Sequence, residues 1–583
     1  MVKTLLSQVR EYKTVSLLTP VCMVFEVVME MVIPLMMASI IDEGVNKGDM
    51  NHIFQVGIWM LLAAALGLLG GVLGGVFGAV ASTGFARNLR KGMFDNIQTF
   101  SFSNIDKFSV AGLVTRLTTD VTNLQMAYQM ILRMCFRAPT NMLCAMAMAF
   151  FINARLASIY LVAVVLLGIV LFTIVSRATR YFRQVFRKYD DLNASVQENI
   201  SGIRVVKAFV REDYENEKFR KAAEKLYEMF VRAEKVVVCN MPVMQFTVYT
   251  CILLISWLGA KMIVSDSLTT GQMMSLLAYC MNILMSLMTL SMIFVMMTMS
   301  MASGERVAEI LTEKSDLVNP EHPDYEVKDG SIEFRHVKFS YSDTAEHPVL
   351  DDINIKIGSG ETIGIIGGTG SSKSSLVNLI SRLYDVREGS VLVGGKDVRS
   401  YDLETLRNQV AVVLQKNVLF SGTILENLRW GNEHATDEEC AEACRLACAD
   451  EFIRQFPDGY NTYIEQGGSN VSGGQKQRLC IARALLKKPK ILILDDSTSA
   501  VDTATDARIR KAFAEEIPDT TKLIISQRIS SVEHADKIIV MEHGEINGFG
   551  THEELLATNE IYRDVYEAQT GGSGDFDEDG GAA

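Results

Sequence analysis

A short run rich in glycine and serine is the part of this sequence best suited to chemistry. Residues 367–374 read Gly-Gly-Thr-Gly-Ser-Ser-Lys-Ser and directly follow the apolar run Thr362–Ile366. A loop of this kind between a strand and a helix points several backbone N–H groups at one place, where they bind phosphate. Lys373 would reach the terminal phosphates, and the Ser374 hydroxyl would hold Mg²⁺. The expected phosphate-binding residues are Gly367, Thr369, Gly370, Ser371, Ser372, Lys373, Ser374 and Ser375.

Two adjacent carboxylates end a second apolar run. Asp495 and Asp496 follow Ile491–Leu494, and this arrangement resembles a Walker B strand, as the glycine-rich loop resembles a Walker A loop. Asp495 is expected to serve Mg²⁺. The next position usually holds a glutamate that orients the attacking water, and Asp496 is one methylene shorter. Because phosphoryl transfer depends mainly on positioning, we expect this retraction to slow hydrolysis.

The two Walker-like motifs indicate only a nucleoside triphosphatase, and a third motif indicates which family of these enzymes the chain resembles. Val471-Ser-Gly-Gly-Gln475 precedes a basic helical stretch and resembles the signature of the ATP-binding cassette (ABC) family. The resemblance covers the whole chain and implies a sandwich dimer, in which each ATP lies between the Walker motifs of one chain and the signature of the other. The further residues that it implies are Tyr341 on adenine, Gln415 near Mg²⁺ with Ser374 and Asp495, Asp502 in the D-loop, and Ser472, Gly473, Gly474 and Gln475 acting in trans.

Three positions depart from the family's pattern. Ser372 replaces the glycine before the lysine, Asp496 replaces the catalytic glutamate, and Gln527 stands where a switch histidine is usual. A glutamine can donate a hydrogen bond to phosphate but cannot carry a charge. A homodimer would contain two impaired sites, whereas a heterodimer would contain one competent site completed by this chain's intact signature. We therefore expect the degenerate half of a heterodimer with a second, non-identical half-transporter, as in some bacterial multidrug exporters.

Six apolar runs in the first half of the chain are each long enough to cross a bilayer. They are 17–41, 54–82, 130–152, 156–176, 236–263 and 273–299. The connections 87–125 and 177–235 are long and basic, so the positive-inside rule places them, both termini and the ATP domain in the cytoplasm. Within them, Arg116–Asp120 and Glu198–Lys207 resemble the intracellular loops of ABC exporters. We expect a multi-pass protein of the cell inner membrane, and the net charge of −13 argues against nucleic acid as a partner.

Beyond the spans, short β-branched runs alternate with helical ones, which is typical of an α/β domain. The expected strands are Ile332–Phe339, Thr362–Ile366, Ala411–Leu414, Ile491–Leu494, Lys522–Ile525 and Ile538–Met541. The predicted fold class is an α-helical transmembrane domain of the ABC exporter type joined to an α/β P-loop nucleotide-binding domain. The predicted domains are a transmembrane domain at 1–311, a linker at 312–330, an ATP-binding cassette domain at 331–570 and an acidic, glycine-rich, disordered tail at 571–583.

Three of the ten cysteines, Cys440, Cys444 and Cys448, follow one another at every fourth position of a predicted helix. No histidine stands at ligand spacing from them. We therefore expect a packed helix face and not a metal site, and we expect all ten thiols to be reduced.

Charged residues inside apolar spans are candidates for the transport path. Glu26 and Glu30 lie four residues apart in the first span and share one helix face. They could line a cavity and attract a cationic substrate, or they could pair with a basic group on a neighbouring helix. Methionines crowd the last span, where they suit either promiscuous apolar binding or plain packing.

These features together predict ATP-driven export of a hydrophobic or drug-like compound, with ATP and Mg²⁺ as cofactors. Lipid or peptide export is the next alternative. An importer with the exporter fold and an ATP-gated regulatory or channel subunit are the other functions that the sequence leaves open.

Overall fold

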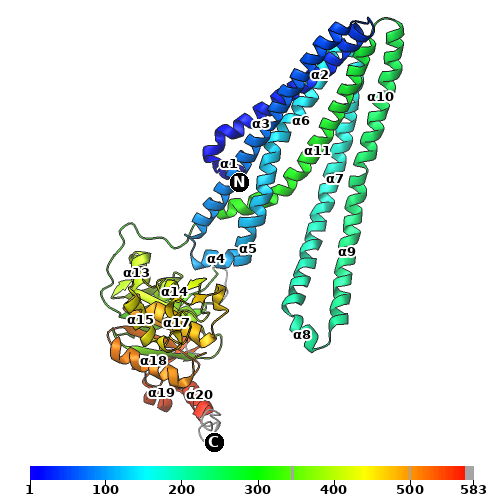
Figure 1. Cartoon of the computed structure of the whole chain (residues 1–583). Helices are drawn as coiled ribbons and strands as arrows, with labels where there is room; N and C mark the ends of the chain where they lie inside the picture. The colour runs from blue at the N-terminus through cyan, green and yellow to red at the C-terminus, as the bar shows by residue number, and fades with distance from the viewer. Residues whose placement is uncertain (343–346, 498–499, 571–583) are drawn as a thin grey trace. The chain divides into compact units, whose positions relative to one another are not determined.

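The computed structural model describes residues 1–342, 347–497 and 500–570, with the side chains of all of these except 183, 186, 187, 190, 194 and 299. The expected tail at 571–583 lies outside the described residues. The chain divides into two compact units. The membrane unit contains Met1–Thr99 and Phe108–Lys314, and the nucleotide unit contains Phe100–Lys107 and the chain from Ser315 onward (Figure 1).

The membrane unit is entirely helical. Among the described residues, six helical stretches are long and apolar enough to cross a membrane, and each contains one of the six expected runs: Arg10–Val45, Met50–Ile97, Val110–Ile152, Ala154–Phe182, Glu212–Val264 and Thr270–Thr312. The helices are α1 (Val2–Ser7), α2 (Lys13–Ser39), α3 (Met50–Ile97), α5 (Val110–Thr115), α6 (Val121–Ile152), α7 (Ala154–Ser201), α8 (Ile203–Ala208), α9 (Glu212–Val238), α10 (Asn240–Val264) and α11 (Thr270–Thr312).

Polar side chains fix where three of the long helices begin. The Asp49 carboxylate accepts hydrogen bonds from the first backbone N–H groups of α3, and the Asn153 side chain does the same for α7. Thr269 and Gln272 form a reciprocal capping box at the start of α11. Helix α7 continues past its apolar span to Ser201, since residues 177–201 contain neither proline nor glycine. It runs beside α9 as far as the short α8 (Figure 1).

Buried tyrosines tie the membrane helices together. The Tyr160 hydroxyl of α7 donates to the carbonyl of Leu276 in α11 at 2.7 Å. The Tyr279 hydroxyl of α11 donates to the carbonyl of Met31 in α2, also at 2.7 Å. Both rings are fully buried. Each phenol therefore contributes a large apolar area to the core while its one polar group stays satisfied.

The two carboxylates of the first span share one arginine. Arg137 of α6 places Nη2 at 3.3 Å from Glu26 and at 3.1 Å from Glu30, both on α2. This contact is the interhelix pairing that the sequence left open beside substrate attraction. Two carboxylates that already share a guanidinium attract an external cation less, so the structure favours a structural role for this pair.

Replacing Arg137 by methionine is expected to destabilise the membrane unit by roughly 2–3 kcal/mol, because two carboxylates then lie uncompensated in a membrane helix. Thermal unfolding of the purified chain in nanodiscs measures the effect. Arg133→Met is the matched control: Arg133 is on the same helix, and no carboxylate among the described residues pairs with it. Equal melting temperatures for Arg137→Met and the unchanged chain would contradict the structural role.

The nucleotide unit contains a six-stranded sheet with the order β12-β11-β3-β10-β9-β6, a four-stranded sheet with the order β2-β1-β4-β5, and the pair β7-β8. In the larger sheet the strands from β11 to β6 are parallel, and β12 is an antiparallel edge. The strands are β1 (Ile332–Phe339), β2 (Leu350–Ile357), β3 (Thr362–Gly367), β4 (Glu388–Val393), β5 (Lys396–Asp397), β6 (Val410–Val413), β7 (Gly422–Thr423), β8 (Tyr463–Ile464), β9 (Ile491–Asp495), β10 (Thr521–Ile525), β11 (Lys537–Glu542) and β12 (Glu545–Gly550).

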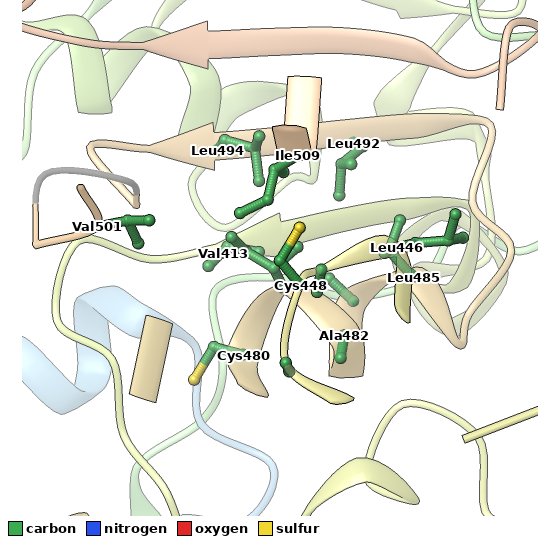
Figure 2. Packing of buried hydrophobic residues seen from close by; sticks show 14 of the residues in the cluster. Val413, Leu446, Cys448, Cys480, Ala482, Leu485, Leu492, Leu494, Val501 and Ile509 are labelled. Carbon is green, nitrogen blue, oxygen red and sulfur yellow. The ribbon is translucent and has the colours of Figure 1, made fainter. Parts of the chain in front are cut away.

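The helices of this unit are α4 (Phe102–Phe108), α12 (Lys373–Ile380), α13 (Leu403–Gln409), α14 (Ile424–Leu428), α15 (Asp437–Leu446), α16 (Asp450–Ile453), α17 (Gly473–Leu485), α18 (Thr503–Glu516), α19 (His552–Thr558) and α20 (Glu560–Thr570). A large apolar core joins β9, α17 and α18, and Figure 2 shows part of it. Cys440 and Cys444 of α15 are buried in this core, as expected for a packed helix face. Cys448 is also buried in it but lies beyond the end of α15 at Leu446, where its φ of +52° departs from the helix that the spacing predicted.

All six strands expected from the sequence are present, within one residue at either end. Strands β2, β4, β5, β7, β8 and β12 were not expected from the sequence. In β2, Asp351, Asp352, Asn354 and Lys356 interrupt the apolar residues, and strands β5, β7 and β8 are two residues long. Such elements are defined by their partners in the sheet and leave little periodic signal in the chain.

Candidate nucleotide-binding site

The glycine-rich loop joins the end of β3 to the start of α12, the context that a phosphate loop needs. The Lys373 ammonium folds back over the loop and donates to the carbonyls of Gly367 and Gly368, each at 2.8 Å. It also donates to the Ser371 hydroxyl at 3.2 Å. Burial lowers the pKa of Lys373, while the nearby Asp495 and Asp496 act in the opposite direction. The cation therefore lies where it can exchange carbonyl partners for phosphate oxygens.

Ser372 adopts a backbone conformation that favours glycine. Its φ of +70° and ψ of 22° lie in the left-handed region, immediately before the first residue of α12. The departure noted in the sequence thus falls at a position where a side chain costs about 1 kcal/mol or more. The turn forms all the same, and α12 begins directly after it at Lys373.

Asp495 ends the buried central strand β9, between β6 and β10. Its side chain is 5% exposed. Burial raises the pKa of this carboxyl, and the negative Asp496 adds to that effect. A hydrogen bond to Ser374 and the charge of Lys373 lower the pKa. The Ser374 hydroxyl and the Asp495 carboxylate, already in contact with each other, are a donor set that fits Mg²⁺ bound beside phosphate.

One pocket of about 320 Å³ gathers most of the expected residues. Its walls are Thr369, Gly370, Ser372, Lys373, Ser374, Ser375, Gln415, Asp495, Asp496, Ile525 and Gln527. Gln415 and Gln527, which lie far from the loop in sequence, are thus brought to the same place. All three departures from the family pattern, Ser372, Asp496 and Gln527, line this one pocket. Gly367, Ser371 and Tyr341 do not belong to the lining.

Main-chain hydrogen bonds hold two of the three departures, Asp496 and Gln527, at the phosphate pocket. The Asp496 N–H donates to the carbonyl of Ile525 at 3.1 Å, which ties the end of β9 to β10. The Gln527 carbonyl accepts a hydrogen bond from Gln569 of α20 at 2.8 Å. This second contact was not anticipated, since no pattern in the sequence links residues 527 and 569.

Tyr341 lies beside the phosphate loop with half of its surface exposed. Its hydroxyl hydrogen-bonds the Ser375 hydroxyl of α12 at 2.8 Å. The ring meets Phe339 edge-on at 4.8 Å and Tyr384 edge-on at 5.1 Å between centroids. These contacts hold the ring in place, and the exposed half of its surface leaves area on which a flat base could stack. Tyr384 was not expected from the sequence, because a single aromatic residue after a helix carries no signal.

The signature segment forms the start of α17. Ser472 caps this helix, since its hydroxyl accepts from the Gln475 N–H and its own N–H donates to the Gln475 side chain. A Cβ atom at Gly474 would lie 2.8 Å from the carbonyl oxygen of Ala500, so only glycine fits there. The helix N-terminus presents backbone N–H groups and the positive end of the helix dipole, which suits an anion.

The D-loop residue Asp502 caps α18 by accepting the Thr505 N–H at 2.9 Å, and this bond lowers the pKa of its carboxyl. The resemblance assigns Ser499–Asp502 to the D-loop, and Ser499 lies outside the described residues. Neither Asp502 nor the signature residues Ser472–Gln475 line the phosphate pocket of their own chain. That separation is what a site completed by a second chain requires.

Comparison with known proteins places both units in one family. Residues 16–305 match the ABC transporter transmembrane region, and residues 350–499 match the ABC transporter domain. The uncharacterized ABC transporter ATP-binding protein YfiB of Bacillus subtilis is 37% identical over 572 residues, which cover 98% of this chain and 99% of that protein. The ATP-dependent lipid A-core flippase of Desulfotalea psychrophila is 33% identical over 488 residues, which cover 83% and 84%.

The fold has a solved counterpart. A bacterial Atm1-family ABC exporter with ATP bound matches with a TM-score of 0.82 and 22% identity, over 96% of this chain and 99% of that chain. At this identity the likeness establishes the fold. With the family matches and the relatives that span nearly the whole chain, it shows that this protein belongs to the ABC transporters, as a multi-pass half-transporter whose membrane-spanning region and ATPase domain share one chain.

Proposed function

We propose that this chain is the degenerate subunit of a heterodimeric ABC exporter that moves hydrophobic compounds out across the cell inner membrane. The observation that carries the proposal is the phosphate pocket, where Ser372, Asp496 and Gln527 stand together. Three departures in one pocket weaken a single step, the alignment of water and γ-phosphate. Phosphate and Mg²⁺ contacts through Lys373, Ser374 and Asp495 are retained.

Two of the departures, Asp496 and Gln527, stand where the attacking water and the γ-phosphate would lie. The first acts through distance and the second through charge. The Asp496 carboxylate stops one methylene short of where a glutamate would reach an attacking water. Gln527 offers a neutral amide in place of a histidine ring, so it stabilises developing negative charge on the phosphate less. Because a water must be held within a fraction of an ångström, such changes slow hydrolysis far more than they weaken binding.

The signature of this chain supports the assignment of the competent site to a partner. Ser472, Gly473, Gly474 and Gln475 form an intact helix N-terminus that lies outside this chain's phosphate pocket. In a sandwich dimer that N-terminus would face the γ-phosphate held by a non-identical half-transporter. Two copies of this chain would give two slow sites, whereas a partner with glutamate and histidine would give one fast site.

The membrane unit contains a cavity suited to an apolar substrate. Its volume is about 780 Å³, and residues of α7, α9, α10 and α11 line it. Met288, Met292, Met296 and Met301 of α11 contribute flexible, polarizable walls. A hydrophobic drug-like compound fits this chemistry best. A lipid is the second candidate, since the flippase named above is a relative over most of the chain.

Restoring the two hydrolytic positions tests the degenerate site. The purified wild-type chain is expected to hydrolyse ATP slowly, and Asp496→Glu with Gln527→His is expected to raise turnover on the order of 10²-fold. Adding Gly473→Asp to the repaired chain is the control, because a carboxylate at the signature should remove the gain. A wild-type chain that turns over as fast as the repaired one would contradict the proposal.

Narrowing the cavity tests the substrate class. Met292→Trp is expected to weaken binding of a hydrophobic fluorescent dye about tenfold, since one buried apolar contact is worth about 1–3 kcal/mol. Met274→Trp is the matched control, on the same helix and outside the cavity lining. Dye titration of the reconstituted chain measures both. An equal effect of the two changes would reject this cavity, and displacement of the dye by added phospholipid would favour the lipid candidate.

A further inference from the structure

The side chain of Gln569 holds the main chain of the segment that carries Gln527. Its Nε2 donates to the Gln527 carbonyl at 2.8 Å, and its Oε1 accepts from the Ile529 N–H at 2.9 Å. A primary amide offers both donors and an acceptor, so this one side chain satisfies main-chain groups on both sides of Arg528. Ile529 is buried, and an unpaired N–H at a buried residue is costly. The contact is therefore a specific bridge between α20 and this segment.

Two other contacts fix the ends of the segment. The Ser526 N–H donates to the carbonyl of Ile365 at 3.3 Å, which continues the pairing of β10 with β3. At the other end, the Ser531 hydroxyl donates to the buried Asp506 carboxylate of α18 at 2.9 Å. The segment is thus attached to the sheet at its start and to α18 at its end, and Gln569 attaches its middle to α20.

Helix α20 is itself anchored in the apolar core. The Tyr562 ring is fully buried there, and its hydroxyl hydrogen-bonds Nδ1 of His552 at 2.7 Å. The Tyr562 N–H donates to the Asn559 side chain at 2.9 Å, just before the helix begins. Gln569 follows Tyr562 by about two helical turns and so lies on the same face of α20. The core therefore determines where the Gln569 amide meets the segment.

The Gln527 side chain is exposed and lines the phosphate pocket, so its direction follows from the main chain that Gln569 holds. A displacement of that main chain by a fraction of an ångström would misplace the amide toward phosphate. We propose that Gln569 is a positioning residue, which holds the Gln527 amide against the γ-phosphate and so favours ATP over ADP in this site. The inference rests on the proposed role of Gln527 at the γ-phosphate, and it gives α20 a part in the retention of ATP.

The rates at which fluorescently labelled ATP and ADP leave the purified full-length chain test the inference. Gln569→Met keeps the length of the side chain and removes both hydrogen bonds. It is expected to speed the release of ATP roughly tenfold, as for the loss of one hydrogen bond to a charged group, and to leave the release of ADP unchanged. Gln527→Ala should have the same effect, and the double variant should lose no more than either single one.

The matched control is Asn319→Leu, which removes another side-chain amide with two hydrogen bonds in the same unit. Asn319 accepts from the Leu403 N–H at 2.9 Å and donates to the Asp402 carboxylate at 2.6 Å, and none of the three lines the pocket. Both release rates should stay at their wild-type values. Faster release of ATP alone in this variant would contradict a specific role for Gln569.

Equal acceleration of ATP and ADP release in Gln569→Met, or wild-type release of both, would overturn the inference. Gln569→Glu keeps the acceptor for Ile529 and loses the donor to Gln527, so it should also speed ATP release, and it decides the matter if Gln569→Met does not fold. Gln527→Ala separates the two proposals. Unchanged ATP release in that variant rejects the role of Gln527, whereas faster ATP release there with an unaffected Gln569→Met rejects only the positioning by Gln569.

Discussion

Parallel pairing of three adjacent strands is the constraint on which the nucleotide site depends. Strand β10 pairs in register with β3 on one side and with β9 on the other, so that Ile525 stands level with Ile365 and with Asp495. The carboxyl ends of these strands therefore meet at one edge, where the phosphate loop, the Asp495 carboxylate and Gln527 follow directly. Neither loop composition nor charge alone would bring Lys373, Asp495 and Gln527 into one pocket; the shared register of the sheet does.

On the proposed function, the chain keeps in that pocket the groups that bind the nucleotide and changes the groups that align the attacking water. Lys373, Ser374 and Asp495 offer charge and coordination, and such contacts tolerate small displacements. Asp496 and Gln527 occupy positions whose usual residues act on a water or a forming charge, where a single bond length matters. Such a site is expected to hold ATP while a partner's site turns it over.

The sequence predicted those parts of the molecule that are set by local pattern. Six apolar runs became six membrane helices, and six β-branched runs became strands, because burial on both faces leaves a continuous apolar signal. Of the residues that line the phosphate pocket, all but Ile525 were expected: the glycine-rich loop and the two aspartates from their local motifs, and Gln415 and Gln527 from the resemblance to the family. What could not be predicted depends on contacts between distant positions. Arg137 meets Glu26 and Glu30, Tyr384 meets Asp106, and Gln569 meets Gln527, and in each case two separate elements had to be placed first.

The central claim of the proposed function is that this chain's own site retains ATP and hydrolyses it only slowly, and the nucleotide that the chain carries tests this most directly. The purified full-length chain is incubated with radiolabelled ATP and Mg²⁺, separated from free nucleotide and denatured, and the released nucleotide is identified by chromatography. We expect one nucleotide per chain, recovered mainly as intact ATP after many minutes. Recovery mainly as ADP over the same time would contradict the claim, and recovery of no nucleotide would contradict retention.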